Sequence, residues 1–376
     1  MYSFRNDYME GAHPRVLDAI VAMNMEQTPG YTDDAICARA RTAIRSAITR
    51  SDAAGALRKA NVAAASLEVE FVAGGTMANL LVMAAGLRPH ECVIAAADGH
   101  INVHETGAIE ACGHKVLTTA DADGLLSVAG IDAVMKAHLG GTNYHMVKPR
   151  MVYLSLATEM GLSFNLKRLK DIFTYTRAHD LLLYIDGARL ACGLAAEGCD
   201  ITLADLCAYS DAFSIGGTKN GALFGEALVI RNPELQRDFR YIMKQKGAVM
   251  AKGRVLGVQF DALFSTADVS ADVPEAHDGD SLFMALGRHS VAMAKELKRV
   301  LEEAGYTSFA SDSNTNQQFL LLENDLAKDF VRAFDADEIA YPDDSRTIVR
   351  MTCRWSTQPE HIDFVRRVLA GEDALQ

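Results

Sequence analysis

The sequence predicts an α/β protein with a largely parallel sheet, followed by a smaller α+β unit. Two observations carry this prediction. Up to about Phe260, short apolar β-like runs alternate with stretches of helical periodicity, which is typical of a parallel sheet covered by helices. From about Asp280 the pattern changes to one long helix and short strands. The chain of 376 residues, 49% of them hydrophobic, is long enough for two such units.

The clearest βαβ unit runs from the strand 151–156 to the strand 181–185. Asn165 is a candidate N-cap for the helix between them, whose apolar residues share one face. Because the two strands are then parallel, Glu159 and Asp186 follow neighbouring strands at the same edge of the sheet. Open α/β sheets bind their ligands at that edge.

The remaining elements are predicted in order along the chain. In the first unit they are a strand at 69–72 followed by a helix over about 77–87, a strand at 92–95 ending near His100, and a hairpin of 222–224 with 227–230. In the second unit they are a helix over 282–304, strands at 319–322 and 347–351, and a closing helix over 358–369. We expect residues 1–262 to form the N-terminal segment and large domain, and residues 263–376 the small C-terminal domain.

Charge and composition exclude several functions. The net charge of −12 argues against a protein that binds nucleic acid or an anionic membrane, since phosphate neutralisation needs clustered Lys and Arg. No apolar run is long enough to span a bilayer, and the first residues do not resemble a secretory signal. The seven cysteines are odd in number and contain no C-x-x-C pair, so we expect free thiols in a reducing, cytoplasmic location.

Asp186 and Lys219 point to a particular cofactor. Lys219 lies in a loop of small residues, and its amine is suited to forming a Schiff base with the aldehyde of pyridoxal 5'-phosphate (PLP). Asp186, at the end of a buried strand, can hold the pyridine nitrogen protonated. A lysine among glycines is more often a solvated turn residue, so the prediction depends on its partners.

Three further features fit that cofactor. Gly74, Gly75 and Thr76 place backbone N–H groups at a helix N-terminus, where a phosphate is stabilised, although a plain glycine turn explains them equally well. His100 follows a strand end and can stack on a pyridine ring, or lie in a surface loop. Glu159 is either a buried general base or a loop carboxylate.

Two arginines are candidates for a substrate carboxylate. Arg189 follows Asp186 by three positions, and Arg350 lies in a strand of the small domain; both can bind a carboxylate in a bidentate manner, or form ordinary ion pairs. The histidines and cysteine at 104, 112 and 114 fit no tetrahedral template, so no metal site is expected.

In this order, these residues resemble the threonine aldolase / β-eliminating lyase family of fold-type I PLP-dependent enzymes. The resemblance extends over most of the chain. It rests on the segments Ser3-Phe4-Arg5-Asn6-Asp7, Gly74-Gly75-Thr76-Met77-Ala78-Asn79, His100-Ile101-Asn102-Val103-His104-Glu105-Thr106-Gly107-Ala108, Thr158-Glu159-Met160-Gly161, Asp186-Gly187-Ala188-Arg189, Gly217-Thr218-Lys219 and Lys244–Arg254.

The resemblance implies roles for individual residues. Lys219 would carry the cofactor, with His100, Asp186 and Glu159 as its catalytic companions. The cofactor-binding set would be Gly75, Thr76, Met77, His100, Asp186, Arg189 and Lys219, and the substrate-binding set Asn6, Arg189 and Arg350. Family members form dimers or tetramers with sites at the dimer interface, where Lys252 or Arg254 would reach a neighbour's phosphate.

The expected reaction is cleavage of an L-β-hydroxy-α-amino acid of the threonine or allo-threonine type to glycine and an aldehyde. Many bacterial members have a second histidine at the position of Glu159, so the general base is left open between His100, Glu159 and a water. An apolar Leu156 is expected to reshape the pocket. Two alternatives are a β-eliminating lyase that releases pyruvate and ammonia, and a PLP-binding protein with little turnover.

Overall fold

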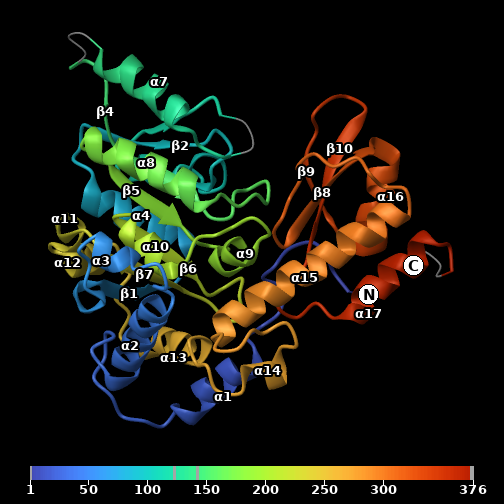
Figure 1. Ribbon diagram of the computed structural model, residues 1–376, viewed down its shortest axis with the longest axis horizontal. Helices are drawn as coiled ribbons and strands as arrows, with labels where there is room; N and C mark the ends of the chain where they lie inside the picture. Colours follow the sequence, from blue (N-terminus) through green and yellow to red (C-terminus); the bar gives the residue numbers. More distant parts are fainter. Residues whose placement is uncertain (1, 122–123, 141–143, 373–376) are drawn as a thin grey trace.

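The computed structural model describes residues 2–121, 124–140 and 144–372, and its largest element is a seven-stranded sheet (Figure 1). The strand order is β1-β7-β6-β5-β4-β2-β3. The strands are β1 (Glu68–Val72), β2 (Glu91–Ala95), β3 (Val116–Thr118), β4 (Lys148–Ser155), β5 (Leu182–Asp186), β6 (Ala212–Gly216) and β7 (Glu226–Ile230).

Strand β7 is antiparallel to both of its neighbours, β1 and β6, whereas β6, β5, β4, β2 and β3 are mutually parallel. The predicted hairpin of 222–224 with 227–230 is therefore wrong, because β7 pairs with β6, a strand that the sequence pattern did not indicate. Residues 222–224 form the turn after Lys219 instead. There the backbone N–H of Leu223 donates to Gln259 Oε1 (2.7 Å) rather than to a neighbouring strand.

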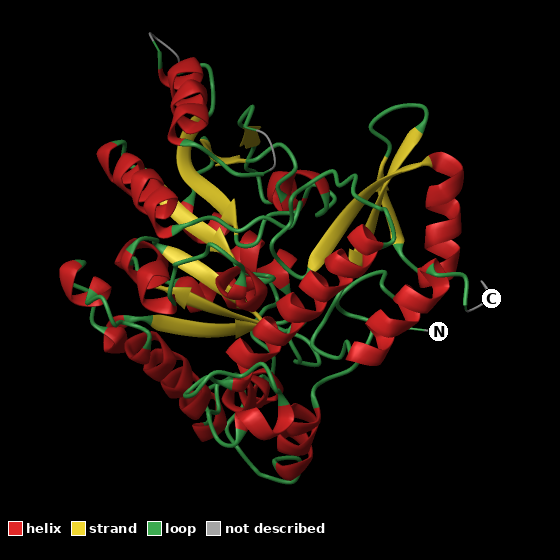
Figure 2. Ribbon diagram, turned by 45° about the vertical axis from the view of Figure 1, so that its right-hand side comes forward, coloured by secondary structure: helices red, strands yellow, loops and turns green. Residues whose placement is uncertain are grey.

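Helices cover both faces of the sheet (Figure 2), and each face has its own apolar core. The βαβ prediction is confirmed, since β4 and β5 are parallel and the helix between them begins after Asn165, whose side chain accepts from Arg168 N. One face carries α4 (Gly75–Gly86), α5 (His100–Val103), α6 (Ala108–Ala111), α11 (Pro233–Gln236) and α12 (Phe239–Gln245). The other carries α1 (Pro14–Ala22), α2 (Ala35–Arg50), α3 (Ala56–Lys59), α7 (Val128–Leu139), α8 (Leu166–Ala178), α9 (Leu190–Ala195), α10 (Leu203–Ala208), α13 (Arg254–Leu263) and α14 (Val269–Asp272).

The C-terminal unit is a three-stranded antiparallel sheet with the order β8-β10-β9, as the predicted α+β pattern requires. Its strands are β8 (Gln317–Glu323), β9 (Asp337–Ala340) and β10 (Arg346–Thr352), and its helices are α16 (Asn324–Phe334) and α17 (Pro359–Leu369). The long helix α15 (Leu282–Glu303) runs from the large core to the small one (Figure 1).

The N-terminal segment packs against the C-terminal unit, far from its neighbours in sequence. Phe4 is fully buried in the core of that unit. Its N–H donates to Phe334 O (3.0 Å), and its carbonyl accepts from Thr352 N (2.8 Å). The boundary at 262/263 stays a prediction. Within the described part of the chain, none of the helices combines the length and the hydropathy needed to cross a bilayer.

Candidate active site

The predicted site residues follow strands whose carboxyl ends lie at one edge of the large sheet. β1 leads into the turn at 73–76, β2 into His100, β4 into Glu159, β5 into Arg189, and β6 into Lys219. Because these five strands are parallel to one another, their loops converge at this edge. Arg189, Glu159 and Asp186 all act electrostatically on the amine of Lys219, so these four side chains lie near one another.

The carboxylate of Asp186 is held by three donors. The Tyr153 hydroxyl (2.7 Å) and Asn79 Nδ2 (3.0 Å) donate to Oδ2, and the backbone N–H of Ala188 donates to Oδ1 (2.9 Å). Asp186 is 5% exposed, so these hydrogen bonds stabilise a charge that burial alone would disfavour. A buried, oriented carboxylate of this kind is what a protonated pyridine nitrogen requires.

Asn79 connects Asp186 to His100. Its Nδ2 donates both to Asp186 Oδ2 and to Glu105 Oε1 (2.7 Å), and its Oδ1 accepts from the Tyr184 hydroxyl (3.0 Å). Glu105 Oε1 in turn lies 2.7 Å from His100 Nδ1. The two residues predicted to contact the cofactor ring therefore belong to one chain of hydrogen bonds, which we call the Asn79 network: His100, Glu105, Asn79, Asp186, Tyr153 and Tyr184.

Sequence reasoning did not assign a role to Asn79, Glu105, Tyr153 or Tyr184. Tyr153 and Tyr184 alternate with core residues on their strands, so they read as ordinary buried aromatics. Asn79 and Glu105 lie within the segments that carry the family resemblance, and a buried polar residue on the apolar face of α4 is the signal that would have singled out Asn79.

The surroundings of His100 raise the pKa of its imidazole. Burial by itself lowers the pKa of this imidazole, but the hydrogen bond to Glu105 and the negative charges of Glu159 and Asp186 outweigh it and raise the pKa above its usual value. His100 is the first residue of α5 and is partly buried. An imidazole held by a carboxylate through Nδ1 keeps Nε2 for a second partner.

Lys219 lies in a desolvated position among opposing charges. Burial lowers the pKa of its amine most, and the nearby Arg189 lowers it further, while Asp7, Glu159 and Asp186 act in the opposite direction. A lowered pKa leaves more of the amine neutral and nucleophilic, as a lysine that attacks an aldehyde needs. Glu226, which begins β7 beside β6, also has a shifted pKa. Burial and the negative charge of Asp186 raise the pKa of its carboxyl group.

The start of α4 fits a phosphate group. Ideal Cβ atoms on Gly74 and Gly75 would meet no atom within 4 Å, so the space beside this backbone is open, and Thr76 is exposed. The first N–H groups of a helix lack intrahelical acceptors and favour an anion. Together with Lys219 and Asp186, the start of α4 supplies the three groups that PLP needs: an amine that reacts with its aldehyde, a carboxylate for the ring nitrogen, and N–H groups for the phosphate.

The loop after β4 places Glu159 and Leu156 on different sides. Glu159 lines a narrow cavity together with Tyr153, Ser155 and Gly99, next to the start of α5. Leu156 is fully buried in the core on the opposite face of the sheet, against Gly193 of α9. Leu156 faces the opposite side of the strand from Tyr153 and Ser155, which line the cavity, and its predicted effect on the substrate pocket stays a prediction.

Arg189 forms a bidentate ion pair with Asp7. Its Nε lies 2.7 Å from Asp7 Oδ2 and its Nη2 3.1 Å from Asp7 Oδ1. The two side chains are 8% and 1% exposed. Burial would raise the pKa of Asp7, but Arg189 and Lys219 overcome it and lower the pKa to about 2. Sequence reasoning missed Asp7 because its partner lies more than 180 positions away in the chain.

The other predicted substrate residues have separate partners. Asn6 Oδ1 accepts from Tyr8 N (3.0 Å), and its carbonyl accepts from Arg354 Nη1 (2.6 Å). Arg350 donates through Nη2 to Asp337 Oδ2 on the neighbouring strand (2.7 Å). The structure thus brings Asn6 beside Arg354 and Arg350 beside Asp337, and a substrate role for Asn6 and Arg350 stays a prediction. Arg254, predicted at the subunit interface, donates to Thr28 Oγ1 (2.9 Å).

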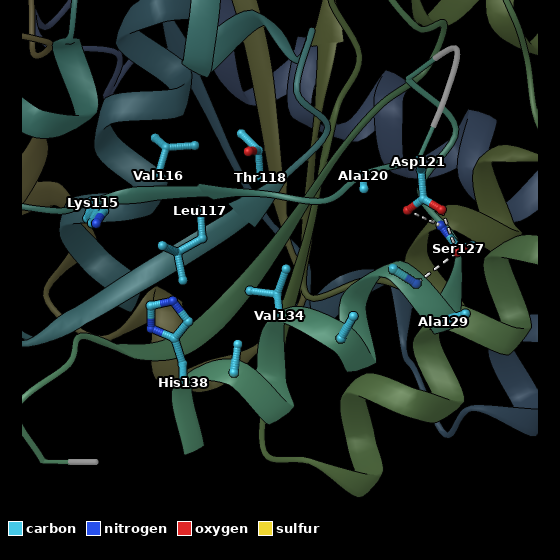
Figure 3. A pocket seen from close by; sticks show the side chains of 13 residues that line it. Lys115, Val116, Leu117, Thr118, Ala120, Asp121, Ser127, Ala129, Val134 and His138 are labelled. Atoms are coloured by element: carbon cyan, nitrogen blue, oxygen red, sulfur yellow. Dashed lines mark hydrogen bonds between the residues drawn. The ribbon is translucent and has the colours of Figure 1, made fainter. Parts of the chain in front are cut away.

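A groove elsewhere on the molecule lies between β3 and α7 (Figure 3). None of the predicted site residues lines it. Several of its polar groups are engaged with one another: Ser127 donates through N (3.0 Å) and Oγ (2.6 Å) to Asp121, and Ser127 Oγ accepts from Gly130 N (2.9 Å), which caps α7. We therefore assign the active site to the edge of the sheet rather than to this groove.

The fold and this site define a fold-type I PLP-dependent enzyme. The structure of Oryza sativa TDC with PLP and tryptamine shares the fold with a TM-score of 0.72, at 13% identity over 98% of this chain and 83% of the other. The β-eliminating lyase family model matches residues 4–325, and the chain belongs to this family.

Two relatives are closer in sequence. A low specificity L-threonine aldolase of Pseudomonas aeruginosa is 32% identical over 274 residues, which cover 70% of this chain and 74% of the relative. The structure of a threonine aldolase from Leishmania major is 40% identical and covers 99% of both chains, with a TM-score of 0.86. Both agree with the family resemblance that the sequence motifs indicated.

Proposed function

We propose that this protein is a PLP-dependent carbon–carbon lyase that cleaves an L-β-hydroxy-α-amino acid of the threonine type to glycine and an aldehyde. The observation that carries the proposal is the convergence of Lys219, Asp186 and the open N-terminus of α4 at one edge of the sheet. The relatives named threonine aldolase support the choice of reaction within the family.

In this proposal PLP, when bound, takes up the electron pair released when the Cα–Cβ bond of the substrate breaks. The residues of the chain would hold it at three points: Lys219 at the aldehyde, Asp186 at the ring nitrogen, and Gly75 and Thr76, followed by Met77, at the phosphate. The three donors to Asp186 fix the position of the carboxylate that would pair with the ring nitrogen.

The proton of the substrate β-hydroxyl needs an acceptor, and two side chains are placed for it. Glu159 lines the cavity next to the start of α5, where His100 lies. The raised pKa of His100 favours its protonated form more than in a free imidazole, and this supports the carboxylate of Glu159 as the base. His100 would then orient the substrate or return a proton.

β-Elimination to pyruvate and ammonia is the second candidate, because the family as a whole is named for it. It uses the same cofactor contacts and differs in the bond that breaks, so the products distinguish the two reactions. We further propose that the protein acts in the cytoplasm as a dimer or tetramer with sites at the dimer interface. Seven free cysteines support a reducing location.

The test is an absorption spectrum of the purified protein with PLP, followed by product analysis. We expect a cofactor band that borohydride fixes to Lys219, and aldehyde plus glycine from L-threonine, L-allo-threonine or phenylserine. A keto acid in place of the aldehyde would establish elimination. A cofactor spectrum that responds to substrate without any product would indicate a binding protein, and no bound cofactor would refute the proposal.

A further inference from the structure

Asp7 is a buried, charged residue in direct contact with Arg189, and the proposed function assigns it no role. Its carboxylate and the guanidinium meet edge to edge, through Nε at 2.7 Å and Nη2 at 3.1 Å. Bidentate pairs of this kind fix the plane of the guanidinium as well as its position. Asp7 therefore decides where the remaining edge of Arg189 points.

The third nitrogen of Arg189 is left for another partner. Within the described part of the chain, Nη1 forms no hydrogen bond. This nitrogen is also not fully buried. The same guanidinium acts electrostatically on the amine of Lys219, so it lies beside the reacting end of the site. An anionic group that enters beside Lys219 would meet Arg189 at Nη1.

Asp7 is itself held from the C-terminal unit. Asn316 Nδ2 donates to Asp7 Oδ2 (3.0 Å) and to Cys353 O (2.9 Å), and Cys353 N donates back to Asn316 O (2.9 Å). Asn316 is 1% exposed. Three residues before Asp7, Phe4 is bonded through its backbone to Phe334 and Thr352, so the carboxylate is anchored on both sides.

We propose that Asp7 is a positioning residue for substrate recognition: it occupies the Nε–Nη2 edge of Arg189 and thereby aims Nη1 at the substrate α-carboxylate. This inference rests on the proposed function, because it takes the substrate to be an amino acid. The recognition point is then assembled from the N-terminal segment, the loop after β5 and the Asn316 loop before β8. None of these parts can aim Arg189 alone.

Replacing Asp7 tests this role directly. Asp7→Asn keeps the size of the side chain but removes the charge, and its amide N–H₂ would face one of the guanidinium nitrogens. The loss of a charge-assisted hydrogen bond corresponds to about 10- to 100-fold in an equilibrium constant. We therefore expect the loss to fall on ligands with a free carboxylate and to spare those without one.

The measurement compares the dissociation constants of glycine and glycinamide for the PLP-loaded enzyme, read from the cofactor absorbance. We expect the wild type to bind glycine at least about 10 times more tightly than glycinamide, and Asp7→Asn to lose most of this preference. With threonine, KM should rise about 10-fold or more, with kcat within about 3-fold of the wild type.

Glu70→Gln is the matched control. Glu70 of the edge strand β1 forms a largely buried ion pair with Arg41 of α2 (3.0 Å), in which the side chains are 5% and 16% exposed. A merely structural role for Asp7 predicts that both variants lose stability and keep the preference for glycine. The proposal predicts that Glu70→Gln keeps the preference for glycine over glycinamide and that Asp7→Asn loses most of it.

Should Asp7→Asn fail to fold, Asn316→Ala provides the second variant, since it removes the donor to Asp7 without touching Arg189; a partial loss of the glycine preference is expected. An unchanged preference in the folded variants, or tighter glycine binding than in the wild type, would overturn the proposal. A wild type that binds glycine but releases no aldehyde from threonine would refute the aldolase function instead. The ratio of the dissociation constants of glycine and glycinamide would still test the role of Asp7.

Discussion

Replacing Asn79 by leucine should destabilise the protein by several kcal/mol, although Asn79 is not expected to touch the substrate. Leucine has a similar size and suits the apolar face of α4, so the change mainly removes hydrogen bonds. It removes the two bonds from Nδ2 to the carboxylates of Glu105 and Asp186, and leaves the Tyr184 hydroxyl without its acceptor.

The magnitude follows from these three bonds. Each bond to a charged group contributes about 1.5–3 kcal/mol, so the two carboxylates together account for about 3–6 kcal/mol. The lost bond of the Tyr184 hydroxyl, which also has Ser214 as a hydrogen-bond partner, adds about 1 kcal/mol. Because a carboxylate that loses a donor can take up a proton, the sum is an upper bound, and we expect about 3–5 kcal/mol. This is a large part of the stability of an ordinary domain.

The assay is urea unfolding of the cofactor-free protein, followed by circular dichroism, because bound cofactor would add its own stabilisation. Asn314→Leu is the control: its side chain donates to Glu197 O (2.7 Å) and accepts from Ser163 N (3.1 Å), which are neutral backbone groups near the surface. If the two variants differ by less than about 1 kcal/mol, the Asn79 network does not carry the energy assigned to it here.

The remaining predictions concern the cofactor lysine, the imidazole and the strand ends. Lys219→Ala should abolish turnover and still bind PLP without a borohydride-stable link, measured by mass spectrometry; retained activity would refute the assignment of the site. The pKa of His100 is raised above 6.5, so its stabilisation is fully present below about pH 6.5 and is lost as the pH rises through the raised folded value. The stability difference between the wild type and His100→Gln in cofactor-free protein should therefore shrink with increasing pH, and a difference that grows would contradict this. Gly216→Ala should cost about 1–3 kcal/mol in thermal unfolding, because its Cβ would collide with the carbonyl groups of Gly187 and Ala188, and the loop after β5 would have to move away from β6; an unchanged melting temperature would refute that close approach.

The order of strands and helices could be read largely from the sequence. Hydrophobic periodicity and local caps such as Asn165 act over a few residues, so the βαβ unit, α4, α15 and the strands β8 and β10 were predicted near their observed bounds. Three strands were not predicted: β3 and β9, which are only three and four residues long, and β6 at 212–216. The apolar turn at 222–224 was taken for a strand instead. Pairing between strands is a tertiary property that periodicity does not contain.

Lys219 in a loop of small residues and Asp186 at the end of a buried strand, taken with the glycine turn at 74–76 and the family resemblance, predicted the cofactor. What only the tertiary structure decided is how the site is held. The Asn79 network and the pair of Asp7 with Arg189 join residues from distant segments, and no local pattern marks them. Buried polar groups become recognisable as a site only when the fold shows which partners satisfy them.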